Sequence, residues 1–205
     1  MYKNLSEFTL IKNYITENST VNTGDYFKKF ISSNVIVNAF SNHISFTKKK
    51  SGLSVKCAFN GSETYETNSG RFRIDDSSYL VLNREQEYSG YIDSLSVVES
   101  FSIFFEKKMV DNIHHSLLAE NFEDMLDYVE TGGDIQPVLF IEKTYNHDDI
   151  ISPALFRVRN YIRRNFTEKL YLEEQFHLIL DLLFSVHKKV IGDIKNFPAI
   201  KPATK

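Results

Sequence analysis

The side chains that bind metal ions in proteins are present, but their spacing argues against a metal site. A metal centre inside a β-barrel typically takes two histidines two positions apart on one strand, with a carboxylate and a third histidine from neighbouring strands. No His-x-His pair occurs, and residues 48–106 contain no histidine. His114 and His115 are adjacent in a helical stretch, where neighbouring side chains point about 100° apart, and Glu174-x-x-His177 lacks the second copy that a di-iron site needs. The sequence therefore predicts no metal and no other cofactor.

Nucleophilic catalysis has equally little support. Cys57 alternates with Val55 and Leu53, so the three side chains share one strand face. A thiol on an apolar face is typical of an inert core residue rather than a nucleophile. The chain has no nucleophile-elbow, phosphate-loop or dinucleotide-binding motif. We therefore expect a protein that is not an enzyme and has no catalytic residues.

The remaining chemistry is the binding of a small molecule inside a barrel, where a mostly apolar pocket offers a few polar contacts. Strand residues of suitable chemistry are Lys56, Tyr65, Arg73, Tyr79, Tyr88 and Tyr91. A slip of one residue in strand register exchanges the two faces, so the sequence leaves open which of these side chains point inward. Lys56 lies opposite the apolar face that carries Cys57, which also fits a position outside the barrel.

The elements that would position these side chains are short strands separated by turns. About seven strands with regularly spaced turn signals are typical of a sandwich or barrel. Asn60-Gly61 is the commonest signal for a two-residue hairpin, and the apolar residues 138–141 suggest one more strand. The expected strands are 34–40, 53–59, 63–67, 72–74, 79–82, 87–92 and 95–105.

From residue 107 onward the apolar residues follow a helical period. Ser152-Pro153 predicts a helix start, with a capping serine followed by proline. A longer helix begins near Thr167 and carries an apolar seam at heptad-like spacing. We expect this seam to form a homodimer interface, or alternatively to be one wide face buried within the monomer. The seam residues are Leu172, Phe176, Ile179, Leu183, Val186 and Val190.

Bulk composition narrows the partners and the compartment. The net charge of −3 argues against nucleic-acid binding by this chain itself, although the end of the chain is lysine-rich. A lone cysteine favours a reducing compartment. No apolar run approaches the roughly 20 residues of a membrane span, and the N-terminus lacks a signal peptide. These features predict a cytoplasmic protein with no membrane contact.

Two stretches, at 75–105 and 197–205, indicate a protein family more specifically than the composition does. Tyr79-Leu-Val-Leu-Asn83, Gln86-Glu-Tyr88 and Glu99-Ser-Phe-Ser-Ile-Phe-Phe105 follow one another in the order found in the N-terminal cupin-type domain of AraC-type transcription regulators. Residues 197–205 resemble the linker that leads into the helix-turn-helix domain of that family. The sequence departs from the pattern at Arg84-Glu85, where glycine is common, and it lacks the helix-turn-helix units.

The resemblance implies an α+β fold, with a cupin-like jelly-roll barrel followed by a helical subdomain. It also implies a sensing and dimerisation domain that responds to an unknown small-molecule effector, with promoter DNA contacted only through the missing helix-turn-helix domain. The alternatives are a metal-independent cupin-type enzyme and a pure protein-interaction domain. The expected divisions are an N-terminal arm and helix at 1–33, the barrel at 34–145, the helical dimerisation module at 146–192 and a linker at 193–205.

Overall fold

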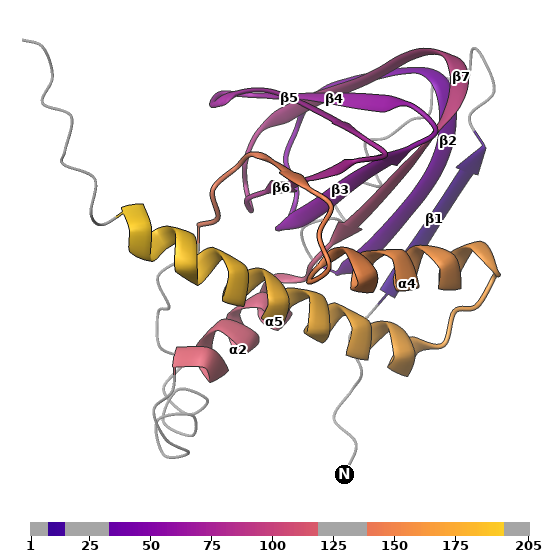
Figure 1. Ribbon diagram of the computed structural model, residues 1–205. Helices are drawn as coiled ribbons and strands as arrows, with labels where there is room; N and C mark the ends of the chain where they lie inside the picture. The colour runs from indigo at the N-terminus through magenta and orange to yellow at the C-terminus, as the bar shows by residue number, and fades with distance from the viewer. Residues whose placement is uncertain (1–7, 15–32, 119–138, 195–205) are drawn as a thin grey trace, which may run out of the picture.

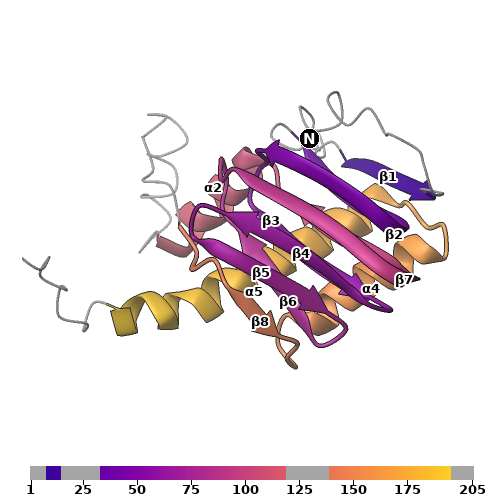
Figure 2. The same ribbon diagram turned by 90° about the horizontal axis from the view of Figure 1, so that it is seen from above.

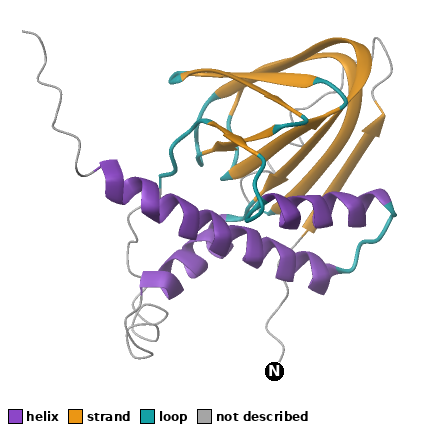
Figure 3. Ribbon diagram, in the orientation of Figure 1, coloured by secondary structure: helices purple, strands orange, loops and turns teal. Residues whose placement is uncertain are grey.

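The computed structural model describes residues 8–14, 33–118 and 139–194. A barrel of strands lies on one side of a layer of helices (Figures 1 and 3). The strands are β1 (Phe8–Tyr14), β2 (Asn34–Lys49), β3 (Ser54–Phe59), β4 (Ser62–Thr67), β5 (Gly70–Asp75), β6 (Ser78–Leu82), β7 (Tyr88–Phe104) and β8 (Thr144–Asn146). The described helices are α2 (Lys107–Leu118), α4 (Ser152–Arg163) and α5 (Lys169–Ile194).

The barrel closes because β7 is long enough to belong to two walls. The strand order is β1-β2-β7-β3-β6-β8, and β4 pairs with both β5 and β7. The first part of β7 pairs with β4, as in Tyr91 with Thr64, and its last part pairs with β3, as in Ser100 with Ala58. All these pairs are antiparallel except β1–β2, which is parallel. The prediction of an α+β protein with a jelly-roll barrel and a helical part is confirmed.

Several local predictions differ from the structure. The segments 87–92 and 95–105 form the single strand β7, and residues 139–141 are not in a strand, since β8 begins only at Thr144. The turn at Asn60 has the expected positive φ of 62°. It does not make a hairpin, because β3 pairs with β6 and β7 whereas β4 pairs with β5 and β7. The turn instead passes the chain from one wall of the barrel to the other.

Within residues 1–33, where an arm and a helix were expected, Phe8–Tyr14 forms an edge strand beside β2. Residues 1–7 and 15–32 lie outside the described residues, as do 119–138 and the expected linker from 195 onward. None of the described helices is long and apolar enough to cross a membrane.

Two apolar clusters hold the fold together. One lies inside the barrel and includes Ala58, Leu82 and Val98. The larger one lies between the sheet and the helices and joins strand residues such as Val55 to helix residues such as Leu155. Seen from above, α4 and α5 run along the sheet (Figure 2). The central strand β3 is buried along its whole length because it has a core on each side.

The start of α4 is close to the predicted position, but its cap differs. The helix begins at Ser152, and Ile151 at its N-cap position makes no side-chain cap hydrogen bond. Asp148 Oδ1 accepts hydrogen bonds from the backbone N–H groups of Ile150 and Ile151, at 2.9 and 2.6 Å. The hydroxyl of Ser152 instead accepts a hydrogen bond from the backbone N–H of Asp148, at 3.0 Å. The two side chains therefore fix the chain that joins β8 to α4.

The expected dimer seam of α5 lies in the chain's own core. Its first four residues are fully or almost fully buried beneath the barrel, and Val186 is partly buried against the same cluster. The side chain of Val190 lies outside the described part of the chain. This is the arrangement of the alternative, in which a wide apolar face is buried within the monomer, and the homodimer itself stays a prediction. The four buried residues are Leu172, Phe176, Ile179 and Leu183.

Candidate ligand-binding site in the barrel

Lys56 points into the barrel, from the middle of β3. The apolar face of this strand, with Val55 and Cys57, packs toward the helices, and the alternation of the strand turns Lys56 and Ala58 to the barrel interior. Lys56 is 2% exposed. The position outside the barrel that the sequence also allowed is therefore wrong, because the more apolar face of β3 covers the helical layer.

The Lys56 ammonium lies among aromatic rings. Its Nζ is 3.7 Å from the ring centroid of Phe104, 5.0 Å from that of Tyr88 and 5.7 Å from that of Tyr65. It donates a long hydrogen bond of 3.5 Å to the Tyr88 hydroxyl. Burial lowers the pKa of Lys56 to about 7, and the nearby Glu63 offsets part of this effect. Ring faces attract a cation but leave most of its hydrogen-bonding capacity unused.

Glu63 is the second ionisable group of the interior, and it is 3% exposed. Burial raises its pKa, while hydrogen bonds from the Ser100 and Tyr65 side chains and the charge of Lys56 act in the opposite direction. Within the described part of the chain, its Oε2 atom has no hydrogen-bond partner. The barrel thus contains an amine and a carboxyl group, each with a pKa shifted toward neutrality.

The wall beside Lys56 and Glu63 is aromatic. Phe46, Tyr65 and Tyr88 pack edge-on or tilted, with ring centroids 5.9 to 6.4 Å apart. Gly90 of β7 leaves room for this cluster, since a Cβ atom there would lie 2.5 Å from Cζ of Phe46. The sheet backbone and the ring of Phe46 are therefore in direct contact.

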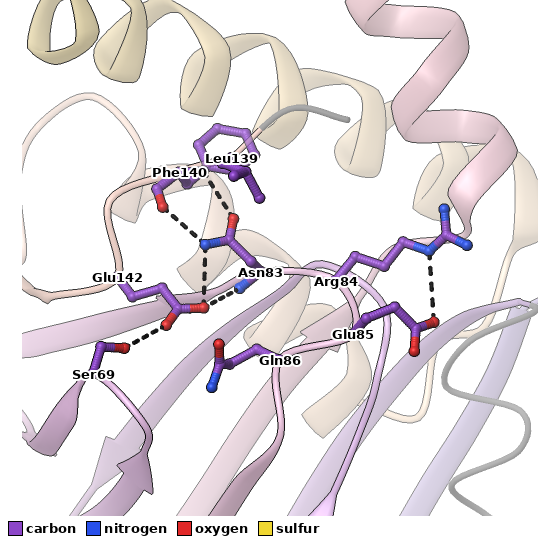
Figure 4. Close-up of a pocket in the computed structure, with 8 residues that line it drawn as sticks. All are labelled: Ser69, Asn83, Arg84, Glu85, Gln86, Leu139, Phe140 and Glu142. Carbon is purple, nitrogen blue, oxygen red and sulfur yellow. Dashed lines mark hydrogen bonds and ion pairs between the residues drawn. The ribbon is translucent and has the colours of Figure 1, made fainter. Parts of the chain in front are cut away.

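The loop 83–87, which joins β6 to β7, lies at the end of the barrel where Tyr88 is found. The backbone N–H of Glu85 donates to the carbonyl of Ser51 at 2.9 Å, and the Tyr88 hydroxyl shares a hydrogen bond with the Ser51 side chain. A cavity of about 420 Å³ lies against this loop. Figure 4 shows its lining residues: Ser69, Asn83, Arg84, Glu85, Gln86, Leu139, Phe140 and Glu142.

Asn83 holds this region together (Figure 4). Its side-chain Nδ2 donates to the Phe140 carbonyl at 2.9 Å, and its Oδ1 accepts from the Phe140 backbone N–H at 2.8 Å. Glu142 accepts from the backbone and side chain of Asn83, and its other oxygen accepts from Ser69. This network gives a physical reason for an asparagine at the end of the Tyr79–Asn83 motif.

The structure brings three of the six predicted ligand-binding residues together, namely Lys56, Tyr65 and Tyr88. Tyr79 is buried on the opposite face, where its ring stacks on Tyr145 at 5.5 Å. Arg73 is exposed and Tyr91 half-buried, each on the outward face of its strand. Sequence reasoning missed Glu63, although it lies two positions before Tyr65 and must share its face. The partners that only the fold reveals are Ser100, Ser102 and Phe104.

Within the described part of the chain, no three histidine, cysteine or acidic side chains are grouped so that they could hold a metal ion. Cys57 is buried among apolar neighbours, and burial raises the pKa of its thiol to about 12. Inside the barrel, the amine of Lys56 and the carboxyl group of Glu63 are suited to proton transfer or to hydrogen bonding with a polar ligand.

No family model matches the chain, and no curated protein matches its sequence. Among solved structures it is similar to ToxT from Vibrio cholerae bound to an unsaturated fatty acid, with 14% identity and a TM-score of 0.49 over 77% of this chain and 55% of that one. It is also similar to an apo variant of ToxT, with 15% identity and a TM-score of 0.48 over 85% of this chain and 61% of that one. The chain spans less than two thirds of either protein, and likeness at this level carries no inference about function.

Proposed function

We propose that this chain is the effector-sensing domain of an AraC-type transcription regulator and that its effector binds inside the barrel. The observation that carries the proposal is the buried pair formed by Lys56 and Glu63. A buried amine and carboxyl group cost free energy unless hydrogen bonds satisfy them. Among the residues that the structure describes, Oε2 of Glu63 has no partner, and the hydrogen bond of Lys56 Nζ is the long one to Tyr88.

The chemistry of the pair indicates the kind of effector. A small polar molecule with an acceptor for Lys56 and a donor for Glu63 would satisfy both groups at once. The rings of Tyr65, Tyr88 and Phe104 would contact its apolar part. Such a molecule would enter beside the loop 83–87, where the Glu85–Ser51 hydrogen bond ties the loop to the barrel.

A path of direct contacts supports a regulatory role for this site. Asn83, at the start of the loop 83–87, binds both backbone groups of Phe140, and the Phe140 ring packs 5.4 Å from that of Phe184 on α5. A ligand that repositions the loop would thereby bias the position of α5, to the extent that it binds the two arrangements with different affinity. Homodimerisation, contact with promoter DNA through a helix-turn-helix domain and action in the cytoplasm belong to the same proposal.

A second candidate function is metal-independent acid–base catalysis. Burial raises the pKa of Glu63 and lowers that of Lys56, and each group feels the charge of the other. Pairs whose surroundings shift their pKa values toward neutrality are typical of general acid–base sites. In this case the barrel would convert its ligand instead of only binding it.

The test is a thermal-shift screen of the full chain with monosaccharides, amino acids, hydroxy acids and polyamines. We expect at least one compound to raise the melting temperature of the wild type, and this shift to be lost in Lys56→Met and in Glu63→Gln. Arg73→Gln serves as the control, because Arg73 points away from the barrel interior, and it should keep the shift. A compound recovered unchanged after incubation supports the sensor, and a compound that is converted supports the enzyme. A hit that both barrel variants retain would contradict the barrel site.

A further inference from the structure

A second cavity lies at the turn between α4 and α5, on the helical layer rather than in the barrel. It has a volume of about 250 Å³. Three of its rings pack on one another, with Tyr161 4.2 Å from Tyr171 and 5.2 Å from Phe166 between ring centroids. Its lining residues are Arg157, Asn160, Tyr161, Arg164, Phe166 and Tyr171.

Hydrogen bonds stabilise the turn between α4 and α5, which carries Phe166 at the surface. The backbone N–H of Phe166 donates to the Tyr161 carbonyl at 3.2 Å, and the N–H of Glu168 donates to the Tyr161 hydroxyl at 3.2 Å. Asn165, which directly precedes Phe166, adopts a positive φ of 62°. Phe166 nevertheless remains 51% exposed and Leu170 60% exposed. Two large apolar side chains therefore face solvent here, namely Phe166, which lines the cavity, and Leu170, which precedes the lining residue Tyr171 in the sequence.

The α4 side of this surface is positively charged, whereas the turn that follows carries the exposed Glu168. The stretch 152–167 contains four arginines and no acidic residue. Two of them, Arg159 and Arg163, point toward Glu99 beneath the barrel. Arg157 donates to the neutral side chain of Gln175 at 3.1 Å. Within the described residues, neither Arg157 nor Arg164 has a carboxylate at ion-pair distance, so both positive charges are available to a partner.

We propose that this cavity binds an acidic peptide segment of a partner protein, with one aromatic or aliphatic side chain in the cavity and carboxylates on Arg157 and Arg164. The volume is below the several hundred Å³ typical of a complete small-molecule site and suits a single side chain. Arg157 on α4 and Arg164 directly after its last residue are seven residues apart, or about 10 Å along the helix axis. An extended peptide spans that distance in about three residues.

The exposed apolar side chains of Phe166 and Leu170 favour this partner over a nucleic acid. A phosphate backbone would use the two guanidinium groups but would leave Phe166 and Leu170 in water. An acidic peptide with an apolar residue satisfies both kinds of group, and aromatic and arginine side chains together are typical of protein interfaces. This site is independent of the effector site in the barrel, so it stands whether or not the barrel binds a ligand.

The experiment measures the fluorescence anisotropy of a fluorescein-labelled peptide, Ser-Glu-Asp-Phe-Leu-Asp-Glu-Ser, titrated with the full chain. We expect binding that weakens with salt, and at least a fivefold weaker affinity in Arg157→Gln with Arg164→Gln, and again in Phe166→Ser. Arg71→Gln is the matched control, since Arg71 is an exposed arginine on the barrel that pairs with Glu66. All three positions are exposed, so circular dichroism should show unchanged folding.

Two further probes make the result decisive. A peptide with serine in place of phenylalanine and leucine keeps every charge, and it should bind at least fivefold more weakly. Equal binding of the two peptides would overturn the proposal, because the cavity would then play no part. Tighter binding of a 20-base-pair DNA duplex that depends on the same arginines would assign the surface to nucleic acid instead. No measurable binding of the phenylalanine peptide at low salt would also overturn it.

Discussion

Arg159 of α4 forms an ion pair with Glu99 of β7 where the barrel meets the helical layer. The Glu99 side chain is 1% exposed, and it also accepts a hydrogen bond of 3.1 Å from Asn38 of β2. The Arg159 guanidinium lies 3.6 Å above the ring of Phe59. One carboxylate therefore connects two strands and a helix, and it does so within the Glu99–Phe105 motif on which the family resemblance rests.

Replacing Glu99 with Gln should destabilise the chain, because it leaves the Arg159 charge without its partner in a largely buried position. Removal of one member of a buried ion pair typically costs about 3–5 kcal/mol. Urea denaturation followed by circular dichroism measures this loss. Replacing exposed Lys107, which pairs with Asp111 on the surface of α2, should leave the midpoint nearly unchanged. Equal effects of the two substitutions would contradict the role given to Glu99.

Gly90→Ala should destabilise the barrel by steric overlap. The new methyl group would lie 2.5 Å from Cζ of Phe46, and overpacking of a tight core costs about 1–3 kcal/mol. If the overlap is the cause, the double variant Gly90→Ala with Phe46→Leu should recover part of the loss. Thermal denaturation of the single and double variants distinguishes this from a general intolerance of β7 to alanine.

The fold follows from the sequence where local patterns decide the structure. The β-branched residues 34–40 located only the first part of β2, which continues to Lys49. Alternation located β3, and the helical period located α4 and α5. The hairpin predicted at Asn60-Gly61 was wrong, because these two residues determine the backbone angles of the turn and not the pairing partners of its two strands. The apolar seam of α5 was expected at a homodimer interface for a related reason. Heptad spacing marks a face that must be buried, and it does not say whether the burial is against the same chain or another.

The site was harder to predict than the fold. β3 is buried on both faces, so the usual assignment of the apolar face to the barrel interior fails and Lys56 points inward. Tyr65 and Tyr88 meet Lys56 only because β7 pairs with both β3 and β4. Their sequence positions carry no sign of that pairing. Tyr79 was misassigned because β6, like β3, is buried along its whole length.

Lys56 should make stability depend on pH between neutrality and pH 10. Burial lowers the pKa of Lys56 from 10.5 to about 7, so in this range the unfolded chain binds more protons than the folded one. Stability linked to this group therefore rises with pH. We expect Lys56→Met to show its largest gain in free energy of unfolding, relative to the wild type, at pH 7 and below.

Urea titrations at pH 6, 7, 8 and 9.5 provide the comparison. The advantage of Lys56→Met should shrink as pH rises, since releasing the proton that the unfolded wild-type amine carries costs less free energy as pH approaches 10.5. A pH-independent difference between the two proteins would show that Lys56 keeps an ordinary pKa in the folded chain. Arg73→Gln again serves as a control, because Arg73 is exposed on the outward face of its strand.

Cys57 should be inert to thiol reagents while the chain is folded. It is 1% exposed, and burial raises the pKa of its thiol to about 12, so almost no thiolate forms at neutral pH. Ellman's reagent at pH 8 should label less than a tenth of the protein in minutes and all of it in 6 M urea. Rapid labelling of the native chain would mean that the β3 face under α4 opens readily.

Asn83→Ala tests the contact path from the loop 83–87 to α5. The substitution removes the two side-chain hydrogen bonds to Phe140 and one of the donors to Glu142. The two lost bonds to Phe140 alone correspond to about 2 kcal/mol. Because Phe140 packs against Phe184, we expect faster hydrogen exchange in residues 139–142 and also in the part of α5 around Phe184.

The comparison with Ser69→Ala separates the path from a general loosening of the pocket. Ser69 donates to the other oxygen of Glu142 and makes none of the bonds to Phe140. Faster exchange in α5 should therefore follow Asn83→Ala and not Ser69→Ala. If Asn83→Ala accelerates exchange only in residues 139–142, the hydrogen bonds of Asn83 fix the segment locally. A ligand at the barrel end would then have to reach the helical layer by another route, such as the ion pair between Glu99 and Arg159 of α4.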